Sequence, residues 1–280
     1  MITYSVIIPY RDKYELLKAA VGSVPEREDI QVVIVDNSDE PLPADLVPKK
    51  QVTRVDYTTS DPKKGAGHAR NVGMTKAEGT YMLFLDADDY FTPDAFDEFD
   101  RYADKRNDIT FFSATSIRLG TGERSRRHMN ISRCIGQYME QGDEDGVRYR
   151  YVTPYCKMFL TSFVRESQIQ FDELPVSNDM MFSIRTGHNA RTIGVSKSVA
   201  YVITEGQSNT SLTRTRTASN QFTRYTVAIE QYKFMEAIGR KDLRFHLLSF
   251  VLHSLTGFGP KEFVKYIRYA ISQKVNIFLR

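Results

Sequence analysis

Three aspartates follow an apolar stretch in the sequence YMLFLDADDYF, residues 81–91. At neutral pH the carboxylates of Asp86, Asp88 and Asp89 repel one another unless a cation neutralises them. Carboxylate oxygens are the ligands that Mg²⁺ and Mn²⁺ prefer, and Mg²⁺ often completes its shell with substrate phosphates. We therefore expect Asp86 and Asp88 to form part of a metal site. For Asp89 and Asp94 the sequence also allows a simpler role, because acidic residues stabilise the N-terminus of a following helix.

Polar side chains also follow two earlier apolar stretches. Residues 4–10 (YSVIIPY) and 30–36 (IQVVIVD) read as buried strands rich in β-branched residues, and Pro9 is expected to end the first. In open α/β sheets, ligands bind beyond the carboxyl ends of the strands. We therefore expect the polar residues at these ends to meet at one site: Tyr10, Arg11, Asp12, Asp36, Asn37, Ser38, Asp86, Asp88 and Asp89.

The segments between these strands predict the sheet that positions them. Residues 13–24 have helical apolar spacing, and residues 65–79 read as a glycine-rich entry into a second helix. Strands that alternate with helices and are almost continuously apolar predict a Rossmann-like α/β fold, a mostly parallel sheet flanked by helices. The later segments are expected to form a strand at 108–119, an irregular polar insertion at 120–150, a helix at 177–189, strands at 190–204 and helices after about residue 219.

Four motifs occur in order: SVIIPYRD, VVIVDNSD, an ARN at a helix start, and a strand that ends in DADD. Together they resemble the family 2 glycosyltransferases, which have the GT-A fold and use nucleotide-diphosphate sugars. The resemblance is strong over residues 3–110 and weaker to about 215. It implies a GT-A catalytic domain over residues 1–210, followed by a C-terminal helical extension over residues 211–280.

The resemblance also implies roles for particular residues. Asp88 would bind the divalent cation, Mn²⁺ or Mg²⁺, that bridges the diphosphate. Asp36 would accept a hydrogen bond from the base, most simply N3–H of uracil, which favours a UDP-sugar, although Asn37 stands where the family often has a second acidic residue. The residues that would bind the nucleotide sugar are Pro9, Tyr10, Arg11, Asp36, Arg70, Asn71, Asp86 and Ala87.

An inverting transfer needs a base for the acceptor hydroxyl. In the family the base is the last residue of an acidic pair after a segment like FDE, and here FDELPVSND places Asn178 and Asp179 at that pair. The resemblance therefore implies Asp179 as the base; its alternative role is to cap the helix that follows. Arg214 and Arg216 lie in a polar segment that could close over the diphosphate or simply face solvent.

Other functions are weighed against this one. A haloacid-dehalogenase-like phosphatase also has DxD after a strand, but Tyr90 stands where Thr or Val is normal. Gly65 and Gly67 begin a dinucleotide motif, but Arg70 replaces its third glycine. A degenerate, non-catalytic sugar-binding protein is a further alternative, because of Asn37 and Asn178. QFTRY at 221–225 is similar to the QxxRW of processive synthases without its tryptophan, so we expect transfer of single sugars.

Composition limits the partners. The net charge of +3 gives no indication of a nucleic-acid partner, and Cys134 and Cys156 lack zinc-ligand spacing. The basic run at 118–133 is most simply a solvated face. We expect a cytoplasmic protein with a glycan or lipid-linked acceptor, because neither a secretory signal nor a membrane span is present. Residues 260–280 combine a basic flank with an apolar stripe that could contact the inner face of a membrane, or pack on the protein: Phe263, Ile267, Ile271, Val275 and Phe278.

Overall fold

The computed structural model describes residues 1–206 and 217–278. Its contacts divide the chain into two compact units, one of residues 1–173 and 178–207 and one of residues 174–177 and 208–280. The boundary that we expect near residue 210 lies outside the described residues, as do Arg214 and Arg216. Among the helices of the described ranges, none is both long and apolar enough to cross a membrane.

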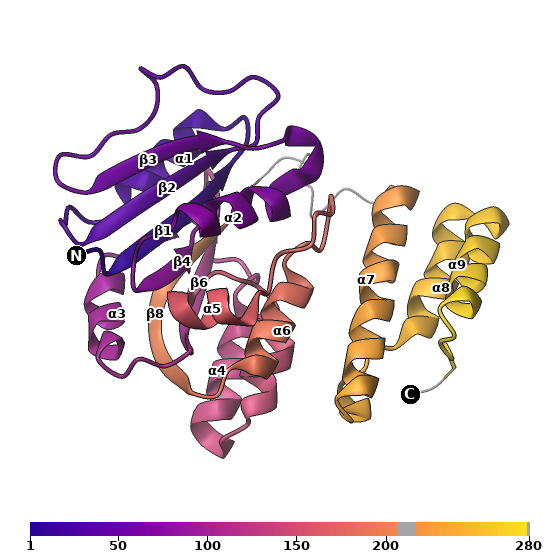
Figure 1. Cartoon of the computed structure of the whole chain (residues 1–280). Helices are drawn as coiled ribbons and strands as arrows, with labels where there is room; N and C mark the ends of the chain where they lie inside the picture. The colour runs from indigo at the N-terminus through magenta and orange to yellow at the C-terminus, as the bar shows by residue number, and fades with distance from the viewer. Residues whose placement is uncertain (207–216, 279–280) are drawn as a thin grey trace. The chain divides into compact units, whose positions relative to one another are not determined.

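The first unit is built on a sheet of eight strands in the order β3-β2-β1-β4-β7-β6-β8-β5. Figure 1 labels β1 to β4, β6 and β8 of this sheet. Strands β1 to β4 are mutually parallel, β6 is parallel to β8, and β7 and β5 run antiparallel to their neighbours. The prediction of a mostly parallel α/β sheet is therefore confirmed. The strands are β1 Tyr4–Tyr10, β2 Ile30–Asp36, β3 Arg54–Thr59, β4 Tyr81–Phe84, β5 Tyr90–Phe91, β6 Ile109–Arg118, β7 Lys157–Leu160 and β8 Ile193–Glu205.

Helices cover both faces of this sheet. Ile30, Val32 and Ile34 of β2 belong to the main core with residues of α1, whereas Val33 and Val35 pack with Ala69 of α2, as alternation along a strand requires. A Cβ atom at Gly73 of α2 would lie 2.4 Å from Ile7 Cγ2, so this glycine allows the helix to approach β1. The helices of this unit are α1 Tyr14–Gly22, α2 Gly65–Lys76, α3 Ala95–Ala103, α4 Met129–Gln141, α5 Thr161–Ser167 and α6 Met180–Asn189, with short turns η1 Pro62–Lys64 and η2 Gly146–Arg150.

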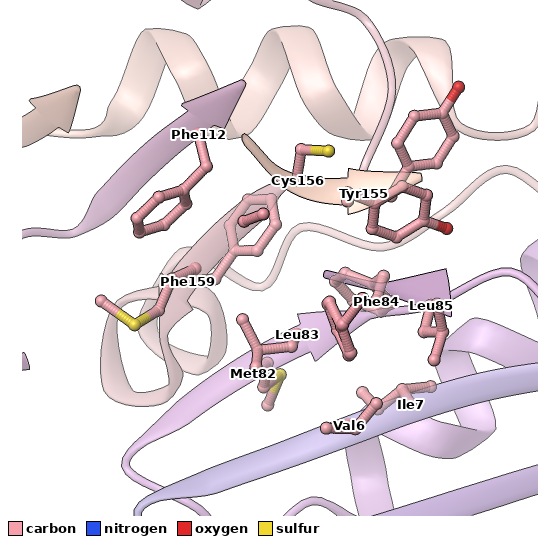
Figure 2. Close-up of a cluster of buried hydrophobic side chains, with 14 of the residues drawn as sticks. Val6, Ile7, Met82, Leu83, Phe84, Leu85, Phe112, Tyr155, Cys156 and Phe159 are labelled. Carbon is pink, nitrogen blue, oxygen red and sulfur yellow. The ribbon is translucent and has the colours of Figure 1, made fainter. Parts of the chain in front are cut away.

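The centre of the core lies where β1, β4, β6 and β7 meet. Figure 2 shows Ile7, Phe84, Phe112 and Phe159 among the side chains gathered there. The rings of Phe84 and Phe159 meet edge to face, with centroids 5.7 Å apart. This apolar layer holds the ends of β1 and β4 in fixed register. The register in turn fixes the positions of the polar residues that follow those ends.

Two local expectations were wrong. Pro9 does not end β1: it pairs with Val35, and it lies beyond the last β1–β4 pair, Ile7–Phe84, where its missing N–H costs no ladder bond. The region 120–150 is not irregular, because it contains α4 and the π-helix η2. Ile131, Cys134 and Ile135 of α4 are buried at helical spacing.

In the second unit the described residues form helices α7 Ala218–Ala237, α8 Leu247–Phe258 and α9 Pro260–Ser272, and the turn η3 Lys241–Leu243. Tyr225, within QFTRY, is buried and stacks on Tyr266 at 4.6 Å, so it serves helix packing. The apolar stripe expected at 260–280 is divided, because Phe263 and Ile267 pack into the helical core whereas Ile271 is 69% exposed. Val275 and Phe278 follow the end of α9.

Candidate functional site

The carboxyl ends of β2, β1 and β4 lie side by side, and their polar residues contact one another. Tyr10 O accepts from Asn37 N at 2.8 Å, and Ser38 Oγ accepts from Asp12 N at 3.2 Å, so the ends of β1 and β2 are joined. Lys13 Nζ lies 3.9 Å from Asp88 Oδ2, which links the end of β1 to the segment after β4. The structure thus brings the three predicted strand ends together.

Arg70 of α2 is the centre of this cluster. It is 6% exposed, and its guanidinium donates from Nη2 to Asp86 Oδ1 at 2.6 Å and from Nη1 to Asn178 Oδ1 at 3.0 Å. Its Nε is buried without a hydrogen-bond partner. Burial lowers the pKa of Arg70, but the charges of Asp86 and Asp179 raise it by more. The net rise makes the group a permanent cation.

The glycines before Arg70 have a packing role. A Cβ atom at Gly67 would lie 2.0 Å from Asp172 O and 3.0 Å from Asn178 Cβ, so only glycine lets α2 approach these two residues. Asn71 joins the same contact, since its amide donates to Phe171 O at 2.9 Å and accepts from Phe171 N at 2.8 Å. Both ends of the Asn71 amide are thus used within the protein.

The four residues of the DADD segment have different surroundings. Asp86 donates its N–H to the Tyr201 hydroxyl at 3.0 Å, and Ala87 packs against the core. Asp89 is 4% exposed and accepts from Thr204 N at 2.7 Å, so it joins this turn to β8. The Asp88 side chain is 42% exposed. Burial and the neighbouring Asp86 raise the pKa of Asp88, and the charges of Lys13 and Arg127 oppose that rise.

These surroundings decide which carboxylates could hold a metal. Among residues 1–206 and 217–278, no three His, Cys, Asp or Glu side chains converge on one point. Asp89 accepts a hydrogen bond from Thr204 of β8, and Asp86 is 28% exposed and bonded to Arg70. Asp88 is therefore the most accessible of the three carboxylates. One or two open carboxylates suit a cation that takes its other ligands from a diphosphate and water.

Asp179 stands at the N-cap position of α6 but makes no capping hydrogen bond through its side chain. The carboxylate therefore does not perform the structural role that the sequence offered as its alternative. Burial raises the pKa of Asp179, while the charges of Arg70 and Lys157 oppose the rise. The result is a half-buried carboxylate beside the Arg70 cluster, in an environment suited to accepting a proton.

At the β2 end, Asp36 is fully buried. Its carboxylate accepts from Ser38 N and Leu42 N, each at 2.9 Å, and from the Tyr57 hydroxyl at 2.7 Å. These bonds fix the turn after β2, and they occupy both carboxylate oxygens that a base would approach. Recognition of a base by Asp36 therefore stays a prediction, and it would require the turn after β2 to move.

The neighbouring predicted residues line the same end of the sheet. Tyr10 is buried, and Pro9 is half-buried beside it. Arg11 is exposed and reaches from β1 toward η1, because it donates to Asp39 Oδ2 at 3.0 Å and to Pro62 O at 3.4 Å.

The sequence interpretation overlooked Lys157 of β7. It is 2% exposed, donates to Tyr151 O at 2.7 Å and lies 4.5 Å from the centre of the Tyr151 ring. Burial lowers the pKa of Lys157 to about 7, and the nearby Asp179 opposes that shift. A lone lysine in the apolar stretch YCKMFL was the signal that could have indicated it.

Residues 5–167, more than half of the chain, match the family model described as glycosyl transferase family 2, and the chain belongs to that family. Its relatives include poly(ribitol-phosphate) β-N-acetylglucosaminyltransferase TarS of Staphylococcus aureus, 24% identical over 72% of this chain and 35% of TarS. Succinoglycan biosynthesis protein ExoW of Rhizobium meliloti is 36% identical over 34% of this chain and 32% of ExoW. The chain thus spans about a third of the length of each.

A solved structure shows the same fold. The crystal structure of S. aureus TarS 1–349 in complex with UDP-GlcNAc aligns with a TM-score of 0.71 at 17% identity, over 97% of this chain and 81% of that one. This likeness supports the GT-A fold expected from the sequence motifs.

Proposed function

We propose that this protein is an inverting, non-processive glycosyltransferase that moves a sugar from a nucleotide-diphosphate sugar to an acceptor hydroxyl. The observation that carries the proposal is the Arg70 cluster, in which one buried cation holds Asp86 and Asn178 beside Asp179. It joins a segment that follows β4 to the start of α6, so a donor site and a base would share one support. Membership of glycosyl transferase family 2 favours this function over a phosphatase.

The proposed mechanism divides the work among these residues. Asp88 would hold Mn²⁺ or Mg²⁺, which when bound stabilises the charge that develops on the leaving diphosphate. Tyr10 and Arg11 at the end of β1, with Asp36 and Asp86, would bind the nucleotide. Asp179 would take the proton of the acceptor hydroxyl as that oxygen attacks the sugar carbon opposite the leaving group, which inverts its configuration.

A titration with UDP, then GDP, with and without Mn²⁺, tests the donor site. We expect metal-dependent binding of UDP to the wild type and at least a tenfold weaker affinity, about 1.4 kcal/mol, for Asp88→Ala. Asp94→Ala is the matched control, because Asp94 lies in the same acidic stretch and makes no capping bond. If neither nucleotide binds with or without metal, the proposed donor site is wrong.

The names of the relatives support the class of acceptor. TarS is a poly(ribitol-phosphate) transferase, GgaB of Bacillus subtilis is a minor teichoic acid biosynthesis protein, and ExoW is a succinoglycan biosynthesis protein. We propose that this protein likewise acts in the assembly of a bacterial surface glycan, on the cytoplasmic side of the membrane. Residues 1–210 would form the catalytic domain, and residues 211–280 the helical extension.

We also propose that α9 contacts an anionic membrane surface. Val264 and Ile271 are 44% and 69% exposed and lie two turns apart on one side of the helix. Lys261, Lys265 and Arg268 form a basic line beside them, and Glu262 is the only acidic residue of α9. An apolar stripe next to a cationic one suits a helix lying in a lipid interface.

Vesicle flotation checks this contact. The wild type should float with vesicles of anionic lipid and not with neutral vesicles, because attraction between the cations and anionic lipid adds to the burial of apolar side chains. Val264→Glu with Ile271→Glu should reduce flotation several-fold. Met139→Glu is the control, since Met139 is 52% exposed on a helix of the other unit. Equal flotation of the three proteins would contradict the proposal.

A non-catalytic sugar-binding protein is the second candidate, because Asn178 replaces one acidic residue of the pair. The Asn178 side chain still accepts from Arg70, so the replacement keeps the hydrogen bond and loses only a charge. The Asp179 experiment below separates this candidate from the enzyme.

A further inference from the structure

The arginines that follow β6 have no part in the proposed reaction. Between residues 118 and 133 there are five arginines and one acidic residue, Glu123. Glu123 is paired with Arg118 at 3.3 Å. Arg124, Arg126 and Arg127 are exposed, and within the described ranges none of these three forms an ion pair with a carboxylate. Cations that share one segment and have no ion-pair partner attract an anion.

This segment, residues 119–128, is named the arginine hairpin because it folds back along β6. Ile117 and Arg124 form an antiparallel bridge, and Ser125 N donates to Ser116 O at 2.8 Å. Ser125 is 6% exposed, and its hydroxyl donates to Ser116 Oγ at 2.8 Å. The His128 ring also lies 2.7 Å from Ser116 Oγ. Buried polar contacts thus hold the exposed arginines in place.

Thr204 of β8 connects the arginine hairpin to the carboxylate turn. Arg127 Nη1 donates to Thr204 O at 3.2 Å. Thr204 itself donates from N to Asp89 Oδ1 at 2.7 Å and from Oγ1 to Asp88 O at 2.5 Å. Arg127 is therefore connected to the turn that carries Asp88 through a single residue, Thr204.

The strand order separates the hairpin from the proposed nucleotide pocket. Tyr10, Arg11 and Asp36 lie at the ends of β1 and β2, on one side of β4. The hairpin follows β6, which lies with β8 on the other side of β4. A donor that spans from β2 to Asp88 leaves the β6–β8 side for the acceptor. The cations are thus placed for the acceptor.

We propose that Arg126 and Arg127 bind a phosphate group of an anionic acceptor chain, such as a polyol-phosphate polymer. The proposal rests on the proposed function and names its acceptor class. Guanidinium groups suit phosphate because they donate two parallel hydrogen bonds and keep their charge at every physiological pH. Further phosphates along such a chain would meet Arg124.

Binding of a fluorescent ribitol-phosphate oligomer, measured by anisotropy in the presence of UDP and Mn²⁺, tests the proposal without requiring turnover. We expect Arg126→Ala with Arg127→Ala to weaken binding by about tenfold or more and to reduce its dependence on salt. The single variant Arg126→Ala, whose side chain is exposed, should give part of the loss without disturbing Thr204. Arg133→Ala is the control, because that exposed arginine bonds to Asn130 on α4.

The other possible results either overturn the proposal or assign the arginines to a different ligand. Equal oligomer binding by the wild type and both variants, or no binding of ribitol-phosphate and glycerol-phosphate oligomers by the wild type, overturns the proposal. So does equal wild-type affinity for a neutral glucan oligomer of the same length. Weaker UDP binding by the variants would assign the arginines to the donor instead. If the proposed function itself is wrong, the titration of the wild type with UDP shows no metal-dependent binding, whatever the oligomer measurement gives.

Discussion

Asp179→Asn should lower kcat by about 10²–10⁴-fold, the range that a positioned general base contributes. Asparagine has nearly the same shape but cannot accept the proton of the acceptor hydroxyl. Because the Asp179 side chain makes no capping bond, the substitution removes no helix cap. The dissociation constant of UDP with Mn²⁺ should stay within a few-fold of the wild-type value, since Asp88 and the β1 end are unchanged.

The pH profile supplies a second readout. A base acts only when deprotonated, and burial raises the pKa of Asp179, so wild-type kcat should fall on acidification at a higher pH than an ordinary aspartate would cause. The Asn variant should lose this acidic limb.

Glu173→Gln is the matched control for Asp179→Asn. Glu173 is an exposed acid in the same segment, bonded to His68 and Lys64, and should be dispensable for turnover. Turnover by Asp179→Asn within a few-fold of wild type would exclude Asp179 as the base. Donor binding without turnover by the wild type, given each acceptor class, would favour the non-catalytic candidate.

Arg70→Met should cost about 3 kcal/mol of unfolding free energy, at the lower end for a broken buried ion pair. Methionine fills much of the same space, but it removes the donor that bonds to Asp86 and Asn178, and it leaves Asp179 with only one of its two neighbouring cations, Lys157. The cost is at the lower end because the Asp86 side chain is 28% exposed and water can reach it. Urea denaturation of the variant and wild type measures the difference.

The double variant Arg70→Met with Asp86→Asn separates charge from packing. Removing the stranded carboxylate should recover part of the loss, which a double-mutant cycle reports as a coupling energy. Arg54→Met is the control, because Arg54 pairs with Asp56 and Glu78 at an exposed edge and should cost well under half as much. A loss below about 1 kcal/mol for Arg70→Met would contradict the central role of this arginine.

Much of the sheet could be predicted because its signal is local. Strands β1, β2 and β4 are nearly continuous apolar runs, and such runs must be buried wherever the rest of the chain lies. The position of the carboxylates after β4 also followed from the order of residues. α4 was overlooked because the polar residues and glycines of region 120–150 outweighed three apolar positions, Ile131, Cys134 and Ile135, whose helical spacing was the better signal.

The sequence by itself determined the fold class, the family motifs and the edge of the sheet at which polar residues gather. The tertiary structure decided which carboxylate stays open: Asp89 is bound by Thr204, 115 residues away, and Asp86 by Arg70, whereas Asp88 remains accessible. It also placed Asn178, 108 residues from Arg70, and set Arg127 beside the turn through Thr204. Propensity and periodicity act over a few residues, whereas these contacts depend on burial and hydrogen bonding between strands and helices far apart in the chain, and only folding brings them together.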